Sequence, residues 1–196
     1  MVRKSFTTLD LVLMALLAVA NGLLTFYGAP LNKMLAAIGG PILTSTIVGI
    51  YMTYGMLAIY IIRKPGAALI TYLIGATVQT LFLPNPYGVA ANYVAAICYA
   101  IAIEAIFAIY RYKRWDYISV MFASVVAVPL WFVCAAYMFG YLKWGIPVLT
   151  IALLVRCVSG ILLCGFLGKW VADRLAGTGL LRTFAIGAKG TLRPEG

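Results

Sequence analysis

Two long apolar runs are separated by the short basic stretch Arg63-Lys64-Pro65-Gly66, and this arrangement restricts the fold more than any other feature. One run covers residues 43–62 and the other covers residues 67–83. Each run approaches the ~20 residues that a helix needs to cross a bilayer. Proline ends a helix and glycine permits a reversal, so the stretch predicts a hairpin between two membrane helices. Basic residues in short loops favour the cytoplasmic side, so we expect this turn to lie there.

The remainder of the chain follows the same pattern. With 64% hydrophobic and only 10% charged residues, the composition excludes an ordinary soluble domain. The apolar runs are continuous and lack the alternation of a β-barrel. We therefore predict an all-α polytopic membrane protein with six transmembrane helices, a transmembrane domain over residues 1–175 and a basic cytoplasmic tail over residues 176–196. The tail is amphipathic near residues 170–181, and we expect disorder beyond. The predicted helices cover about residues 9–26, 42–62, 67–83, 89–110, 117–138 and 148–167.

The basic residues predict the orientation of these helices. The predicted outer loops cover residues 27–41, with a short helix over residues 31–37, and residues 83–88 and 139–147. Of the 15 Lys and Arg residues, only Lys33 and Lys143 fall in these loops, and Arg156 falls within a helix. This asymmetry indicates a multi-pass protein of the cell membrane with both termini in the cytoplasm. It also explains the net charge of +10, which in this context does not indicate nucleic acid.

Several kinds of chemistry are disfavoured. The chain has no histidine, which removes Ser-His and Cys-His catalysis and the commonest transition-metal ligand. It also has no GxxxxGK[ST] loop, so we do not expect it to hydrolyse ATP. The four cysteines lie in apolar runs without a CxxC pair and are interpreted as packing residues. We expect no enzyme activity, cofactor or metal.

Two ionisable residues lie deep in predicted helices, Glu104 and Arg156. Such groups are costly in a bilayer and need a partner or a role. They form an ion pair between their helices, or one or both line a ligand pocket or contact a partner. Asp10, at the start of the first helix, suits the helix dipole.

The outer halves of the predicted helices carry a different set of polar and aromatic residues. Gln79 and Asn92 lie within apolar runs, where an amide is costly unless it is hydrogen-bonded. The two amides can converge on one ligand, and amides with rings suit a small planar heterocycle. The aromatic residues can equally form the interfacial belt of a membrane protein. The other members of the set are Tyr51, Asn85, Tyr87, Tyr99, Trp131, Tyr137 and Trp144.

The first predicted helix carries small residues on one face, Ala15, Ala18 and Gly22. Small residues at this spacing allow another helix to approach closely. That helix belongs either to a partner subunit or to this chain.

Several segments together carry a family resemblance: residues 62–69, Glu104-Ala105 followed by Arg111, Arg156 with Ser159-Gly160, and residues 165–169. Through them the chain resembles the substrate-binding (S) component of energy-coupling factor (ECF) vitamin transporters, and more narrowly the YkoE-type thiamine/hydroxymethylpyrimidine branch. The resemblance implies a six-helix bundle with a site open to the outside. It also implies a membrane coupling (T) subunit docked on the small residues of the first helix, and two ATPase subunits.

The chain departs from that branch near the outer pocket, where Ser45, Gln79 and Ala135 stand at positions at which we expect acidic residues. The predicted function is capture of thiamine or hydroxymethylpyrimidine outside and its delivery inside. The alternatives are an S component for another small vitamin or heterocycle, a lipid-modifying membrane enzyme, and an assembly partner without a ligand. The predicted substrate-binding residues are Ser45, Tyr51, Gln79, Asn92, Tyr99, Trp131 and Arg156.

Overall fold

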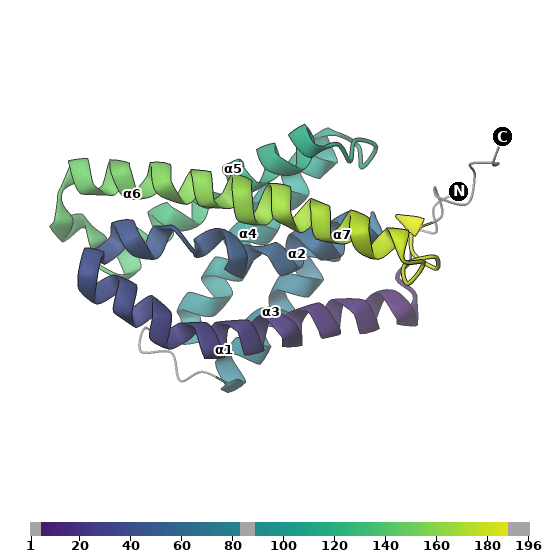
Figure 1. The fold of residues 1–196 in the computed structure, drawn as a ribbon, viewed down its shortest axis with the longest axis horizontal. Helices are drawn as coiled ribbons and strands as arrows, with labels where there is room; N and C mark the ends of the chain where they lie inside the picture. Colours follow the sequence, from purple (N-terminus) through teal and green to yellow (C-terminus); the bar gives the residue numbers. More distant parts are fainter. Residues whose placement is uncertain (1–4, 83–88, 188–196) are drawn as a thin grey trace.

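The computed structural model describes residues 5–82 and 89–187, and within these ranges the regular structure is entirely helical (Figure 1). The last three helices, α6, η2 and α7, follow one another without a break and form one rod over residues 146–177. This rod, α1, α4 and α5 are long and apolar enough to cross a membrane, whereas α2 and α3 are apolar but shorter. The elements are α1 (Thr8–Ser45), α2 (Val48–Ile62), α3 (Ala67–Phe82), α4 (Val89–Ile109), α5 (Tyr117–Met138), the 3₁₀ helix η1 (Tyr141–Trp144), α6 (Ile146–Ser159), the π-helix η2 (Gly160–Leu167) and α7 (Gly168–Gly177).

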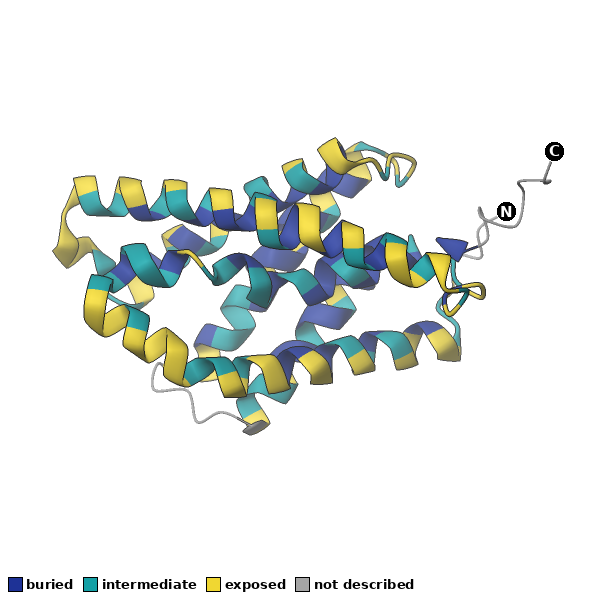
Figure 2. Cartoon of the chain, in the orientation of Figure 1, coloured by how far each residue is buried: buried dark blue, intermediate teal, exposed yellow. Residues whose placement is uncertain are grey.

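Helix α2 is the centre of the bundle. Its sequence is apolar on every face, which suits a helix that is surrounded by others. It packs against α1, α3, α6, η2 and α7, and ten of its 15 residues are buried. Figure 2 shows the buried residues gathered in the middle of the molecule and the exposed ones along the outer sides of α1 and the rod.

The predicted basic hairpin is confirmed, since α2 ends at Ile62 and α3 begins at Ala67. The reversal uses left-handed backbone at Arg63 and Gly66. The guanidinium of Arg63 lies 5.3 Å from the ring of Trp115, in the turn between α4 and α5. The two basic turns, residues 63–66 and 110–116, therefore lie together, and we call this the turn end of the bundle.

Glu104 belongs to the turn end. Its carboxylate accepts hydrogen bonds from the Ala68 N–H (2.9 Å) and from the Tyr112 hydroxyl (2.6 Å). Burial and the hydrogen bond to Glu104 raise the pKa of Tyr112, so the hydroxyl remains a donor. Arg156 instead donates from Nε to Ser45 Oγ (3.1 Å). Glu104 and Arg156 thus lie at different depths and have different partners, so this structure does not form the ion pair that was one of the alternatives for them.

Asp10 does more than face the helix dipole. It forms a capping box with Thr7 at the start of α1, and its carboxylate pairs with Lys64 at 2.5 Å. Lys64 Nζ also donates to the carbonyl of Ser5. These bonds hold the start of α1 on the turn between α2 and α3.

The prediction that residues 27–41 form a loop with only a short helix is wrong in conformation. α1 continues through this segment to Ser45, with a kink at Gly39 and Gly40. Gly40 has φ 53° and ψ −139°, a backbone conformation that glycine alone adopts readily. Of the Gly and Pro residues that predicted a loop, Gly39 and Gly40 form a kink in the helix. Pro30 lies within the helix and does not end it.

The small residues of α1 face the chain itself. Ala18 and Gly22 are buried, and Ala15 is partly exposed. α1 packs against α2, α3 and α6, so close approach serves packing within the chain. Burial of Ala18 and Gly22 favours the alternative in which these small residues pack within the chain, and docking of a partner subunit at Ala15, Ala18 and Gly22 stays a prediction.

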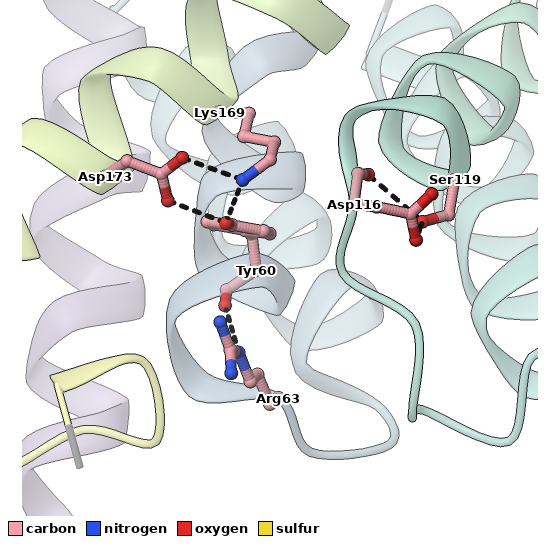
Figure 3. A network of polar contacts seen from close by, with 6 residues as sticks. All are labelled: Tyr60, Arg63, Asp116, Ser119, Lys169 and Asp173. Carbon is pink, nitrogen blue, oxygen red and sulfur yellow. Dashed lines mark hydrogen bonds and ion pairs between the residues drawn. The ribbon is translucent and has the colours of Figure 1, made fainter. Parts of the chain in front are cut away.

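The C-terminal segment returns to the turn end. The α7 side chains Lys169 and Asp173 bind the hydroxyl of Tyr60 on α2 (Figure 3). After α7 the chain turns back, Leu181 and Ile186 are buried, and the Ile186 N–H donates to the Ile61 carbonyl (3.3 Å). The expected disorder beyond residue 181 is therefore wrong as far as residue 187, and the rest lies outside the described residues.

Candidate functional site

A cavity of about 710 Å³ lies at the end of the bundle opposite the turn end. It is enclosed by the second half of α1, the first residues of α2 and α4, the end of α3, and η1. We call this the cavity end. Its volume is in the range that holds a small organic molecule.

The structure brings most of the predicted site residues together here. Ser45 lies behind the wall, where it accepts the hydrogen bond from Arg156. Asn92 donates from Nδ2 to Thr80 Oγ1 (3.2 Å), which joins the end of α3 to the start of α4. Ligand binding by these residues stays a prediction. The predicted residues that line the cavity are Tyr51, Gln79, Asn92, Tyr99, Trp131 and Arg156.

The other aromatic and amide candidates have different positions. Trp144 lines the cavity, whereas Tyr137 is exposed and does not. Asn85 and Tyr87 lie outside the described residues.

A row of aromatic rings leads from the core into the cavity. The ring centroids are 4.9 Å apart for Tyr54 and Tyr72, 5.8 Å for Tyr72 and Tyr99, and 6.3 Å for Tyr99 and Trp131. The row continues from Trp131 to Phe139 at 5.9 Å. Rings held in this way give the cavity a stiff wall on which a flat ligand can stack.

The junction between α1 and α2 positions Arg156. Gly49 packs so closely against α6 that a Cβ there would lie 2.2 Å from the Ser159 carbonyl. Ser159 Oγ donates to the Thr46 carbonyl (2.7 Å) and accepts from the Gly49 N–H (3.0 Å). Ser159 and the Arg156–Ser45 bond thus attach α6 to this junction and set the guanidinium at the cavity wall.

The kink of α1 lets η1 close over the cavity. At Gly40 a Cβ would lie 3.1 Å from the ring of Trp144. The glycine therefore serves both the backbone kink and the contact with the indole.

The contribution of α1 to the cavity does not follow from the predicted helix bounds. The predicted loop over residues 27–41 leaves Asn32 and Lys33 without a place at the site, and Thr25 falls at the end of the predicted first helix, yet all three line the cavity. Their spacing was the available signal. Cavity-lining positions 25, 29, 32, 33, 36 and 40 follow the three- and four-residue steps of one helix face.

In the described part of the chain, no group of three His, Cys, Asp or Glu side chains comes together. Cys98 on α4 and Cys134 on α5 lie with their Sγ atoms 3.7 Å apart. Both are free thiols.

Comparisons with known proteins agree with this geometry. Residues 9–130 match the family model described as "ABC-type cobalt transport system, permease component". The chain is 34% identical over 184 residues to the "Putative HMP/thiamine permease protein YkoE" of Bacillus subtilis (strain 168), and the match covers 94% of this chain and 92% of that protein. A crystal structure of an S-component of an ECF transporter superposes with a TM-score of 0.88 at 33% identity, covering 95% of this chain and 94% of the other.

Proposed function

The chain belongs to the S-component family of ECF transporters, in its YkoE-type branch, and from this premise we propose that it binds hydroxymethylpyrimidine or thiamine for import. The curated relative is named for both compounds. Capture takes place at the cavity end, and the ligand is released on the other side of the membrane.

The cavity is the observation that carries this proposal. It combines a row of rings with the amides of Gln79 and Asn92, all at one end of an S-component-like bundle. An amide can both donate to and accept from an aminopyrimidine. The rings offer the flat faces on which a pyrimidine stacks.

The proposed arrangement has six membrane-spanning segments with both termini in the cytoplasm. The turn end carries Arg63, Lys64 and the basic 110–116 turn, so it faces the cytoplasm under the positive-inside tendency. The cavity end then opens outside. A membrane coupling subunit and two ATPase subunits supply the energy, and co-purification from the native host tests for them.

Titration calorimetry on the purified chain tests the proposed ligand. We expect both hydroxymethylpyrimidine and thiamine to bind, with thiamine not greatly preferred. Gln79→Ala should weaken both by a similar factor, because a lost hydrogen bond is worth about 1–3 kcal/mol, or roughly five- to 150-fold in affinity.

Thr150→Ala is a suitable control, since Thr150 is exposed on α6 and does not line the cavity. Failure of both compounds to bind the unmodified chain would remove this ligand class. A different molecule released from the purified protein and identified by mass spectrometry would replace it with another heterocycle.

A further inference from the structure

Arg156 is a buried cation on the cavity wall. The residue is 4% exposed, and its guanidinium lies 4.9 Å from the centre of the Phe132 ring. A guanidinium has five N–H donors and stays charged in proteins. Only the Nε donor is used within the described chain, on Ser45. The contact with Phe132 engages the charge but uses no donor, so the two terminal amino groups have no hydrogen-bond partner among the described residues.

No carboxylate of the described chain compensates this charge. The sequence has five Asp and Glu residues. Those that the structure describes have partners elsewhere: Asp10 pairs with Lys64, Glu104 accepts from Ala68 and Tyr112, Asp116 accepts from Ser119, and Asp173 pairs with Lys169. The remaining one, Glu195, lies outside the described residues. None of the residues that line the cavity is acidic.

A second cation lies in the same cavity. Lys33 lines it from α1. Arg156 and Lys33 are thus the charged residues of the cavity, and both are positive. A buried charge without a counter-charge is costly, and a ligand that brings an anionic group relieves that cost.

From these observations we infer that the cavity selects an anionic planar heterocycle, with its phosphate or carboxylate group on Arg156 and its ring on the aromatic row. The inference rests on the proposed function as an S component that captures a heterocycle in this cavity, and it departs from that proposal in one respect: the preferred ligand is an anionic relative of the pyrimidine, rather than the neutral pyrimidine or thiamine. A planar guanidinium matches either oxyanion through two parallel hydrogen bonds. Thiamine carries a fixed positive charge, which Arg156 and Lys33 repel. The neutral pyrimidine lacks the group that the guanidinium takes.

Titration calorimetry on the purified full chain can separate these ligand types. The probes share one ring system: hydroxymethylpyrimidine, its phosphate monoester, the corresponding pyrimidine-5-carboxylate, and thiamine. We expect at least one of the two anionic compounds to bind about tenfold or more tighter than the neutral parent, as a charge-assisted hydrogen bond implies. Thiamine should bind no tighter than the parent. The tighter of the two anions shows whether the site is built for phosphate or for carboxylate.

Variants locate the selectivity. Arg156→Gln should bind the neutral parent but lose the preference for the anion, while Arg156→Lys should keep part of it. Lys33→Met should reduce the preference, and Lys143→Met serves as its matched control, because Lys143 is an exposed cation on η1 that does not line the cavity. If Arg156→Gln does not fold, two measurements still test the preference for an anion: the ligand series on the unmodified chain, and the comparison of Lys33→Met with Lys143→Met.

The outcomes are distinguishable. Tighter anion binding that collapses in Arg156→Gln or Lys33→Met supports the inference. The inference is overturned if the neutral parent binds as tightly as both anions, or if thiamine binds more tightly than the parent. Either result leaves the proposed function in place. Absence of binding by every probe overturns the proposed function and this inference together.

Discussion

At the scale of single residues, Asp10 connects two elements that are far apart in sequence. Its carboxylate accepts from the Thr7 N–H and pairs with the ammonium of Lys64, and both charged side chains are about nine-tenths buried. Once one member of a buried pair is removed, the other keeps its charge without compensation.

Asp10→Asn tests this pair. The variant should lower the free energy of unfolding by about 3–5 kcal/mol, because Lys64 loses its counter-charge in a buried position. Thermal unfolding of the purified protein in detergent measures the change. Asp116→Asn is the control, since Asp116 is exposed and accepts only local hydrogen bonds around Ser119. Equal unfolding temperatures for the two variants would mean that the pair does not stabilise the fold.

Sequence reasoning found residue types at the site better than it found their partners. Gln79 and Asn92 were recognised because amides are conspicuous in apolar runs, and both line the cavity. The partner of Arg156 was not found, since Ser45 lies 111 residues away. Partnerships of this kind depend on helix tilt and rotation, and the spacing of residues along one helix does not determine either.

At the scale of elements, the close packing of α1 leads to a prediction about bulk. Ala18→Trp should destabilise the protein by about 1–3 kcal/mol or more, because Ala18 is fully buried and an indole has no room there. Ala20→Trp on the same helix is the matched control, because Ala20 is exposed. Folded yield and unfolding temperature in detergent compare the two. An Ala18→Trp protein as stable as Ala20→Trp would show that α1 is less tightly packed than its burial indicates.

The contact between α4 and α5 can be checked by chemistry. Because the thiols of Cys98 and Cys134 lie 3.7 Å apart, a short bifunctional thiol reagent should link them within one chain. Intact-mass measurement would show one added linker and two lost thiols. Cys134→Ser should abolish the link, whereas Cys157→Ser should leave it. Linking that survives Cys134→Ser would place another thiol beside Cys98.

The helices whose bounds agree best with the sequence prediction are α3, α4 and α5. α3, α4 and α5 begin at the predicted residues, and their ends differ by no more than about a residue. α1 was predicted too short because Pro30 and the Gly39–Gly40 pair look like loop residues. That segment packs against other elements, for example where Gly40 approaches the ring of Trp144 at the kink, and local propensity does not report such contacts.

At the scale of the whole molecule, the described parts of both chain ends meet at the turn end. Ser5 accepts from Lys64, and Ile186 donates to Ile61. The cavity lies at the other end. The basic turns lie at the same end as the described parts of the chain ends, as the distribution of basic residues predicts. The packing of the C-terminal segment on α2 does not follow from the sequence.

Single-cysteine labelling on a cysteine-free background tests the orientation. A cysteine at exposed Leu142 on η1 should react with an impermeant reagent added to intact cells, and one at exposed Lys113 in the α4–α5 turn should react only after permeabilisation. The reverse pattern would invert the proposed topology. It would also place the cavity on the cytoplasmic side.

The π-helix η2 has a consequence for how the last rod can vary. In a π-helix each backbone hydrogen bond spans five residues, whereas in an α-helix it spans four. The side chains of α7 are therefore rotated about the rod axis relative to where an uninterrupted α-helix would place them. On the α6 side of η2, Arg156 reaches the cavity, and on the α7 side Lys169 reaches Tyr60. One residue of an α-helix corresponds to a rotation of about 100°. Deleting a residue from η2 would therefore rotate α7 relative to α6 by about that angle. Arg156 and Lys169 could then no longer reach the cavity and Tyr60 at the same time, so the length of η2 couples the two ends of the molecule.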